Sequence, residues 1–243
     1  MKNREYTRSF YDHRHEQTEY AATVILSLLL DVIPFPNSAI DVGCGVGTWL
    51  KVLRDKGIMD IRGLDGSWVD KDLLAIPQEH FQVTDLSEPL NLHRKFDLAL
   101  SLEVAEHLPK ENADGFVESL CNLSDFVLFS AAIPLQGGAH HANEQWPDYW
   151  IRLFHTRGYV GFDCIRRRIW SNKKIPSWYK QNVFLFVSAN RLQDVKIASE
   201  EREGCSWPLV VVHPDTYLAE SVQRSLRLLQ RSLQSWLRRR LAR

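Results

Sequence analysis

The chain has 243 residues, of which 44% are hydrophobic and 25% charged, so it can form one large globular domain or two small ones. Seven of its arginines lie between Ser221 and Arg243, where there is no acidic residue, and the rest of the chain is therefore mildly acidic. An acidic body argues against a nucleic-acid groove, which needs a basic surface. Four widely spaced cysteines argue against a zinc site or a disulfide scaffold, and they favour a reducing cytoplasm.

The amino-terminal part is polar and aromatic over residues 6–20 and apolar over residues 21–34. The apolar run is too short to span a bilayer, and it contains Asp31. We predict a core-facing helix over about residues 18–32, ended by Pro34 and Pro36. Residues 1–36 are assigned to a helical cap or lid.

Strands and helices alternate in the next part of the chain. Short apolar runs predict strands, and periodic segments between them predict helices. This alternation is typical of βαβ units, which form a parallel sheet covered on both faces. A later helix and two strands, the latter interpreted as an antiparallel pair, complete a core domain over residues 37–212. The strands are expected within 38–47, 59–66, 80–86, 95–103, 125–134, 159–170 and 181–190, and the helices at 48–57, 109–124 and 147–157.

The last segment, residues 213–243, has a different pattern. Leucines recur at helical spacing from Val222 onward, and arginines fall on the opposite face of the helical wheel. We predict a basic amphipathic helix. Docking on the acidic body is favoured, but peripheral contact with an anionic inner membrane surface, dimerisation and nucleic-acid binding are alternatives.

The sequence "DVGCGVGTW", residues 41–49, places Gly43, Gly45 and Gly47 between a predicted strand and a predicted helix. Glycines there permit positive φ and let the backbone approach a ligand closely. The N–H groups at the start of the helix then face that ligand. Because no GK[ST] follows, the turn is not a P-loop.

Acidic residues follow the next strands. Asp65 ends the second strand and suits two ribose hydroxyls, because a carboxylate can accept from both. Asp85 ends the third strand, where it can lie near an adenine amino group. The segment "SLEVAEHLP" follows the fourth strand. Open α/β sheets bind ligands at the carboxyl ends of their strands.

With these motifs, residues 38–109 resemble the class I S-adenosylmethionine-dependent methyltransferases. The resemblance implies a Rossmann-like, doubly wound, mostly parallel seven-stranded sheet with helices on both faces and an antiparallel last strand. It also implies S-adenosyl-L-methionine as cofactor and S-adenosyl-L-homocysteine as product. The cofactor is expected to contact Tyr11, Asp41, Gly43, Cys44, Gly45, Gly47, Asp65, Gly66, Asp85, Leu86, Leu102, Glu103 and His107.

Two features refine this resemblance. A dehydrogenase would prefer GxGxxG, whereas Thr48 stands at the last position of that pattern. The segments "EVAEH" and "NEQWP" resemble the sequences of bacterial enzymes that methylate small molecules or glycans. We therefore favour O-methylation of a small-molecule or sugar hydroxyl. N-methylation, RNA or protein methylation and a non-catalytic cofactor-binding scaffold are the alternatives, and no nucleic-acid partner is expected.

The stretch "LQGGAHHANEQWPDYW", residues 135–150, follows the fifth strand and is expected on the acceptor side. A hydroxyl acceptor must lie about 3 Å from the methyl group, in line with it, and a base must take its proton. We predict His141 as that base, with His140 and Glu144 as further catalytic residues. A metal bound by these three side chains is an alternative, but adjacent histidines point in different directions, so no metal is expected.

Polar and aromatic residues near these histidines are candidates for binding the acceptor. Asn143 can bind substrate hydroxyls, although it can also cap the following helix, with Glu144 in the first turn of that helix. Trp146, Tyr149 and Trp178 can line a pocket, since sugars and flat rings stack on aromatic faces.

Overall fold

The computed structural model describes residues 8–196 and 211–217, with only the backbone described for residues 8–16. The predicted arginine-rich helix lies almost wholly outside these residues, and so does the side chain of Tyr11. Within the described part, no helix is both long and apolar enough to cross a membrane.

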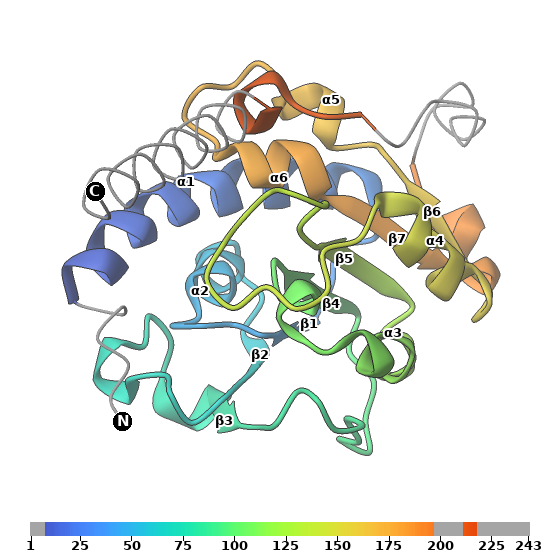
Figure 1. Cartoon of the computed structure of the whole chain (residues 1–243). Helices are drawn as coiled ribbons and strands as arrows, with labels where there is room; N and C mark the ends of the chain where they lie inside the picture. Colours follow the sequence, from blue (N-terminus) through green and yellow to red (C-terminus); the bar gives the residue numbers. More distant parts are fainter. Residues whose placement is uncertain (1–7, 197–210, 218–243) are drawn as a thin grey trace, which may run out of the picture.

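A sheet of seven strands forms the centre of the molecule, in the order β3-β2-β1-β4-β5-β7-β6 (Figure 1). β7 pairs antiparallel with both β5 and β6, and the other pairs are parallel. The predicted fold class is thereby confirmed, including the antiparallel last strand. The strands are β1 (Ser38–Val42), β2 (Asp60–Asp65), β3 (Phe81–Val83), β4 (Leu98–Leu102), β5 (Phe126–Ser130), β6 (Tyr159–Phe162) and β7 (Phe184–Ser188).

Helices cover both faces of this sheet, because each face buries its own cluster of apolar side chains. Helices α1, α2, α5 and α6 contribute to one cluster, and α3 and α4 to the other (Figure 1). Five short 3₁₀ helices occur in the described loops. The helices are α1 (Arg8–Val32), α2 (Thr48–Asp55), α3 (Ala113–Leu123), α4 (Pro147–His155), α5 (Arg166–Ile169), α6 (Ser177–Asn182), η1 (Lys71–Leu73), η2 (Gln78–His80), η3 (Ala105–His107), η4 (Lys110–Asn112) and η5 (Ala189–Asp194).

Helix α1 begins at Arg8, well before the predicted start near residue 18. The apolar stripe that predicted the helix begins only at Ala21, and its members Ala21, Ile25 and Leu29 are completely buried. The preceding polar turns continue the helix without a core-facing stripe, so hydrophobic periodicity could not reveal them. Lys51 of α2 donates to Glu19 of α1 at 2.7 Å and ties the two helices together.

The predicted strand over residues 159–170 is a strand only as far as Phe162, and the short helix α5 follows it. Arg166 explains the change. Its guanidinium is buried, donates to the Asp163 carboxylate at 3.0 and 2.6 Å and to the Gln181 carbonyl at 2.8 Å, and lies over the Phe184 ring. A buried charge needs such a paired setting, which an exposed strand position would not provide.

The loop between β5 and α4 runs over the carboxyl ends of β4 and β5 (Figure 1). The backbone N–H groups of Ala142 and Asn143 both donate to the Glu106 carbonyl, at 2.8 and 2.9 Å. The Gln145 N–H donates to the Ala132 carbonyl at 3.1 Å. The two bonds to Glu106 hold the histidine-containing loop against the segment that follows β4, and the bond to Ala132 joins the two ends of that loop.

Candidate active site

The glycine-rich turn after β1 is packed on one side and open on another. Gly43 has φ +86°, and a Cβ there would lie 2.3 Å from Cγ2 of Val104. Gly45 has φ +54°, and a Cβ there would meet no atom within 4 Å. The turn therefore needs glycine at Gly43 for packing, while the space above Gly45 leaves its backbone open to a ligand.

Asp65 joins the end of β2 to this turn. It is 7% exposed, and its carboxylate accepts from the N–H of Gly45 at 2.6 Å and of Gly66 at 2.7 Å. Burial raises the pKa of Asp65, while these two backbone bonds and the Trp68 side chain oppose the rise. With these three donors, one of the about four lone-pair positions of the carboxylate is left to accept from a ribose hydroxyl.

Asp41 is a second buried carboxyl group beside the turn. It is 2% exposed, and its Oδ2 has no hydrogen-bond partner among the described residues. Burial raises the pKa of Asp41 well above its usual range, and the Asp65 charge adds to the rise. Burial, followed by the charges of Asp41 and Asp65, also raises the pKa of the Cys44 thiol. An unpartnered buried oxygen at this turn fits a cofactor that brings a positive charge and N–H donors.

Trp68 was not singled out from the sequence, although it lies three residues after Asp65. Its side chain is 73% exposed, and a Cβ on Gly66 would lie 2.2 Å from the indole ring. A tryptophan three residues after the acid that ends β2 is the sequence signal that could have identified it, because aromatic faces stack on flat rings.

The remaining predicted cofactor residues line the neighbouring strand ends. Asp85 is exposed, and its Oδ1 accepts from the N–H and the hydroxyl of Ser87 at 3.0 and 2.6 Å, which lowers its pKa. Leu86 and Leu102 are buried in the core. The structure thus places Asp85 at the rim of the site and the two leucines beneath it.

Glu103 has a positive φ of +57°, which is strained for a residue with a side chain. Its carboxylate accepts from Nδ2 of Asn182 at 3.0 Å and from Nε2 of Gln136 at 2.9 Å. Burial raises the pKa of Glu103 despite these bonds. Asn182 and Gln136 come from distant segments and were not identified from the sequence. Together the three side chains connect β4, the loop after β5 and α6.

On the acceptor side, the structure brings His141 together with Glu144, His107 and Glu106. Nδ1 of His141 lies 2.8 Å from Oε1 of Glu144, and the rings of His107 and His141 meet edge to face with centroids 4.9 Å apart. Glu106 is completely buried beside them. Burial raises the pKa of Glu106 well above its usual range, and the Glu103 charge adds to the rise.

The other predicted acceptor-side residues differ in exposure and in their contacts. His140 is exposed and has φ +62°, whereas Asn143 is 2% exposed and accepts from Gln145. Trp146 is 38% exposed, and Tyr149 packs edge to face on Trp150. In α6, Trp178 is half-buried beside Tyr179.

The alternative role considered for Asn143 and Glu144 at the start of α4 is wrong. Helix α4 has Trp146 at its N-cap, without a side-chain capping bond, and Asp148 is the acid of its first turn. Glu144 instead accepts from the backbone N–H groups of Leu135 and Gly137, at 2.8 and 3.0 Å. The physical reason is that Pro147 starts the helix and has no backbone N–H, so the first turn has one fewer donor that needs a capping partner.

The family model described as "Methyltransferase domain" matches residues 12–160. The chain belongs to this methyltransferase family. The match covers both the glycine turn and the histidine loop, and it confirms the family expected from the sequence. A comparison with curated protein sequences gives no match.

Solved structures with a similar fold agree with this membership. Magnesium protoporphyrin IX methyltransferase (ChlM) from Synechocystis PCC 6803 with bound SAM is 20% identical with TM-score 0.51, over 72% of this chain and 80% of that chain. Streptomyces venezuelae DesVI is 16% identical with TM-score 0.56, over 74% and 95%. Human N-acetylserotonin methyltransferase in complex with SAM is 16% identical with TM-score 0.52, over 74% and 55%. At these identities the likeness shows the fold.

Proposed function

We propose that this methyltransferase uses S-adenosyl-L-methionine to methylate a hydroxyl group of a small molecule or glycan. The observation that carries the choice of a hydroxyl acceptor is the bond between His141 and Glu144, because a hydroxyl must lose its proton during the reaction. S-adenosyl-L-methionine, which ChlM and N-acetylserotonin methyltransferase hold in their structures, supplies an activated methyl group on a sulfonium and leaves as S-adenosyl-L-homocysteine.

The cofactor side of the site would be formed by the turn after β1 and the acid after β2. The open space above Gly45 admits the cofactor against the backbone. Asp65 has a lone pair left for a ribose hydroxyl, and Oδ2 of Asp41 offers a partner for a positively charged group. Trp68 supplies an exposed aromatic face nearby for stacking.

His141 is the proposed base, and Glu144 positions it. The Glu144 carboxylate accepts a hydrogen bond from Nδ1–H of His141, so Nδ1 carries the proton of the neutral ring. The other ring nitrogen, Nε2, then has a lone pair that can take the proton of the acceptor hydroxyl. The His141 side chain is only 12% exposed, which limits competition from water. Glu144 also accepts from Leu135 and Gly137, so the carboxylate that orients the imidazole fixes the loop as well.

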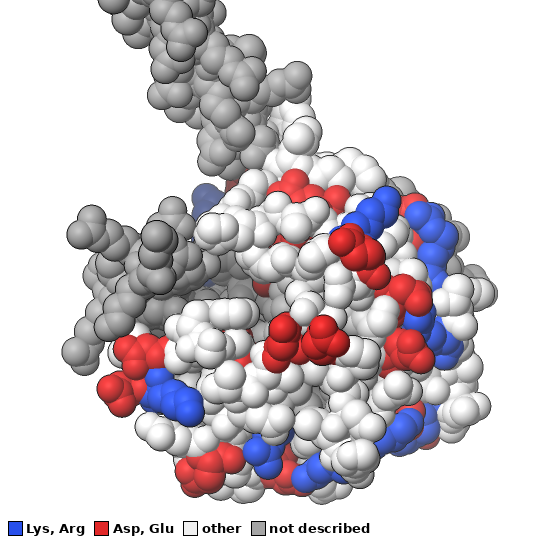
Figure 2. Space-filling model, turned by 60° about the horizontal axis from the view of Figure 1, so that its bottom comes forward, with Lys and Arg blue, Asp and Glu red and all other residues white. Residues whose placement is uncertain are grey.

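The charges on one face of the molecule favour a small acceptor over a nucleic acid. On the face drawn in Figure 2, acidic and basic side chains of the described residues are interspersed and form no continuous basic surface. The predicted acceptor-binding residues include Trp146 and Tyr149, and both present aromatic surface on which a sugar or a flat ring can stack.

The test is a screen of acceptors with S-adenosyl-L-methionine labelled in its methyl group. Hydroxylated small molecules and saccharides are compared with matched amines, RNA and protein substrates. We expect the label in an ether formed on a hydroxyl. Label that goes only into amines, RNA or protein would contradict the proposal. His155→Ala, which changes an exposed histidine in the last turn of α4, serves as the control and should leave the rate unchanged.

A further inference from the structure

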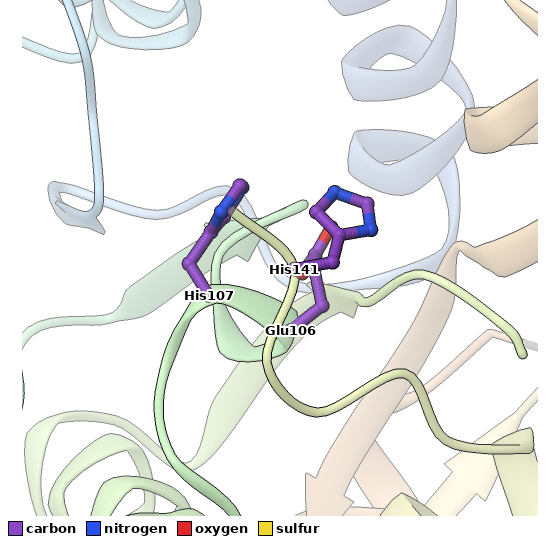
Figure 3. A group of neighbouring side chains, drawn as sticks. All are labelled: Glu106, His107 and His141. Atoms are coloured by element: carbon purple, nitrogen blue, oxygen red, sulfur yellow. The ribbon is translucent and has the colours of Figure 1, made fainter. Parts of the chain in front are cut away.

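Three side chains from two segments of the chain lie close together on the proposed acceptor side of the site. Glu106 and His107 belong to η3 after β4, and His141 belongs to the loop after β5 (Figure 3). One ligand atom from each of the three lies within 4.8 Å of those of the other two. We propose that Glu106, His107 and His141 form a binding site for a first-row divalent transition-metal ion.

Glu106 provides the strongest support for a cation. Its side chain is completely buried, yet neither carboxylate oxygen forms a hydrogen bond of ordinary geometry with a described residue. A buried carboxyl group without a partner costs free energy unless it is paired or coordinates a metal. The backbone N–H groups of Glu106 itself and of Ala132 are near enough to oppose the rise of its pKa, but neither forms a hydrogen bond of ordinary geometry with the carboxylate, whose oxygens therefore keep coordination capacity for a cation.

His141 already forms the hydrogen bond that is typical of a metal-bound histidine. Such a histidine donates its other ring N–H to a carboxylate or a carbonyl, which fixes the tautomer and the orientation of the ring. Nδ1 of His141 lies 2.8 Å from Oε1 of Glu144, so Nε2 carries the lone pair. Glu144 is itself fixed by the backbone of Leu135 and Gly137.

The three side chains must move closer together to hold one ion. In a tetrahedral site, metal–nitrogen and metal–oxygen bonds of about 2.0–2.2 Å place two ligand atoms about 3.3–3.6 Å apart. The observed upper limit of 4.8 Å is more than about 1 Å longer than this spacing, and rotations of the two imidazole rings can shorten it. His107 is exposed, so an ion can enter from solvent on that side.

The donor set selects the class of ion. Two imidazoles and one carboxylate suit Zn²⁺, Mn²⁺, Fe²⁺ or Co²⁺, whereas Mg²⁺ prefers oxygen ligands and keeps several waters. Three protein ligands leave a coordination position open, as catalytic metal sites do. This ligand set differs from the one weighed from the sequence, because His140 is exposed and Glu144 binds His141 instead of joining the group.

The proposed metal site adds a mechanism to the proposed function. Its role in catalysis rests on that proposed function, whereas metal binding itself does not. Nε2 of His141 cannot hold a metal and accept a proton at the same time. In the metal-bound chain, the acceptor hydroxyl would coordinate at the open position, become more acidic and release its proton to solvent. His141 would then act as a ligand rather than as the base.

The binding test uses the full chain, stripped with a chelator and titrated with Zn²⁺ or Mn²⁺ in a calorimeter without cofactor or acceptor. We expect one ion per chain, at least tenfold tighter binding of either ion than of Mg²⁺, and at least hundredfold weaker binding for Glu106→Gln, His107→Ala and His141→Ala. Glu144→Gln should weaken binding about 10–100-fold. The control His155→Ala should bind as the wild type does.

Absence of Zn²⁺ and Mn²⁺ binding, or unchanged binding in all three ligand variants, would overturn the proposal. Circular dichroism melts of each variant separate lost binding from lost folding, and Glu106→Gln keeps the shape of the side chain. Because this titration needs no methyl transfer, its failure leaves the proposed function standing. Once an acceptor is known, methyl transfer should fall on chelation and return with Mn²⁺; equal rates would refute the catalytic part.

Discussion

The two sides of the candidate site are built in different ways. On the cofactor side, residues 41–49 form the whole turn, and Asp65 is held to it by two backbone hydrogen bonds. On the acceptor side, the residues come from η3 and from the loop after β5, and Glu106 is left without such bonds. The difference indicates that the first side is preformed by the backbone, whereas the second depends on side chains and on what they bind.

The acceptor side is tested most strongly by His141→Ala. Loss of the proposed base or metal ligand should lower turnover by about 10²–10⁴-fold while cofactor affinity stays within about threefold, because the imidazole lies beyond the glycine turn. Steady-state kinetics and calorimetry with S-adenosyl-L-homocysteine measure the two effects. If cofactor affinity fell by as large a factor as turnover, His141 would also contribute to cofactor binding.

The cofactor side is tested by Gly43→Ala. The new Cβ would lie 2.3 Å from Val104 at φ +86°, so we expect the free energy of unfolding to fall by about 2–4 kcal/mol. Urea unfolding measures this change.

A matched pair separates strain from binding. Gly45→Ala and Gly57→Ala both have positive φ with no atom within 4 Å of the new Cβ, so each should cost about 1–2 kcal/mol. Only Gly45→Ala should also weaken cofactor binding, since its Cβ enters the open space at the turn. Equal cofactor affinity in these two variants would refute the placement of the cofactor.

Asp65→Ala leaves the N–H groups of Gly45 and Gly66 without their acceptor and removes the proposed ribose contact. We expect cofactor affinity to fall by about 10–100-fold, since a hydrogen bond to a charged group contributes about 1.5–3 kcal/mol. Calorimetry with S-adenosyl-L-homocysteine measures the loss. The control Asp70→Ala, at an exposed carboxylate that caps η1, should bind normally, and unchanged affinity in Asp65→Ala would rule out the ribose assignment.

The smallest effect concerns the dependence of stability on pH. The pKa of Asp41 is raised in the folded chain, so the folded state holds a proton that the unfolded state has lost above its usual pKa of 3.8. The contribution of Asp41 is therefore complete below that pH and is lost as pH rises, by at most about 1.4 kcal/mol per unit. Asp41→Asn should make this decline shallower in urea unfolding between pH 5 and 8.

Asp85→Asn is the control for that experiment. The pKa of Asp85 is lowered, so both the folded and the unfolded state have an ionised carboxylate above pH 5. The slope between pH 5 and 8 should then match the wild type. If the free energy of unfolding of Asp41→Asn also declined with pH as steeply as that of the wild type, other buried carboxyl groups would cause the decline.

The sequence predicted the sheet and the family because both depend on local patterns. Apolar runs such as those of β1 and β4 predict strands directly. The three glycines follow the first predicted strand, and Asp65 ends the second. The start of α1 was missed, because its first turns carry no apolar stripe. Arg166 turned an expected strand into a helix through contacts that only the tertiary structure creates.

The acceptor side was less accessible to prediction. His141 and Glu144 were singled out, and the structure joins them, but Glu106 reads in the sequence as an ordinary charged residue. Its burial follows from the way η3 folds under the histidine loop. Asn182 reaches Glu103 across 79 positions of sequence, and a single sequence contains no pattern that pairs them.

Glu106 serves two segments through different atoms. Its backbone carbonyl accepts from Ala142 and Asn143, while its carboxyl group lies beside His107 and His141. The same residue therefore holds the loop through its backbone and contributes a carboxyl group to the proposed metal site. A ligand bound by the Glu106 carboxyl group would therefore contact the same residue whose backbone holds the histidine-containing loop in place.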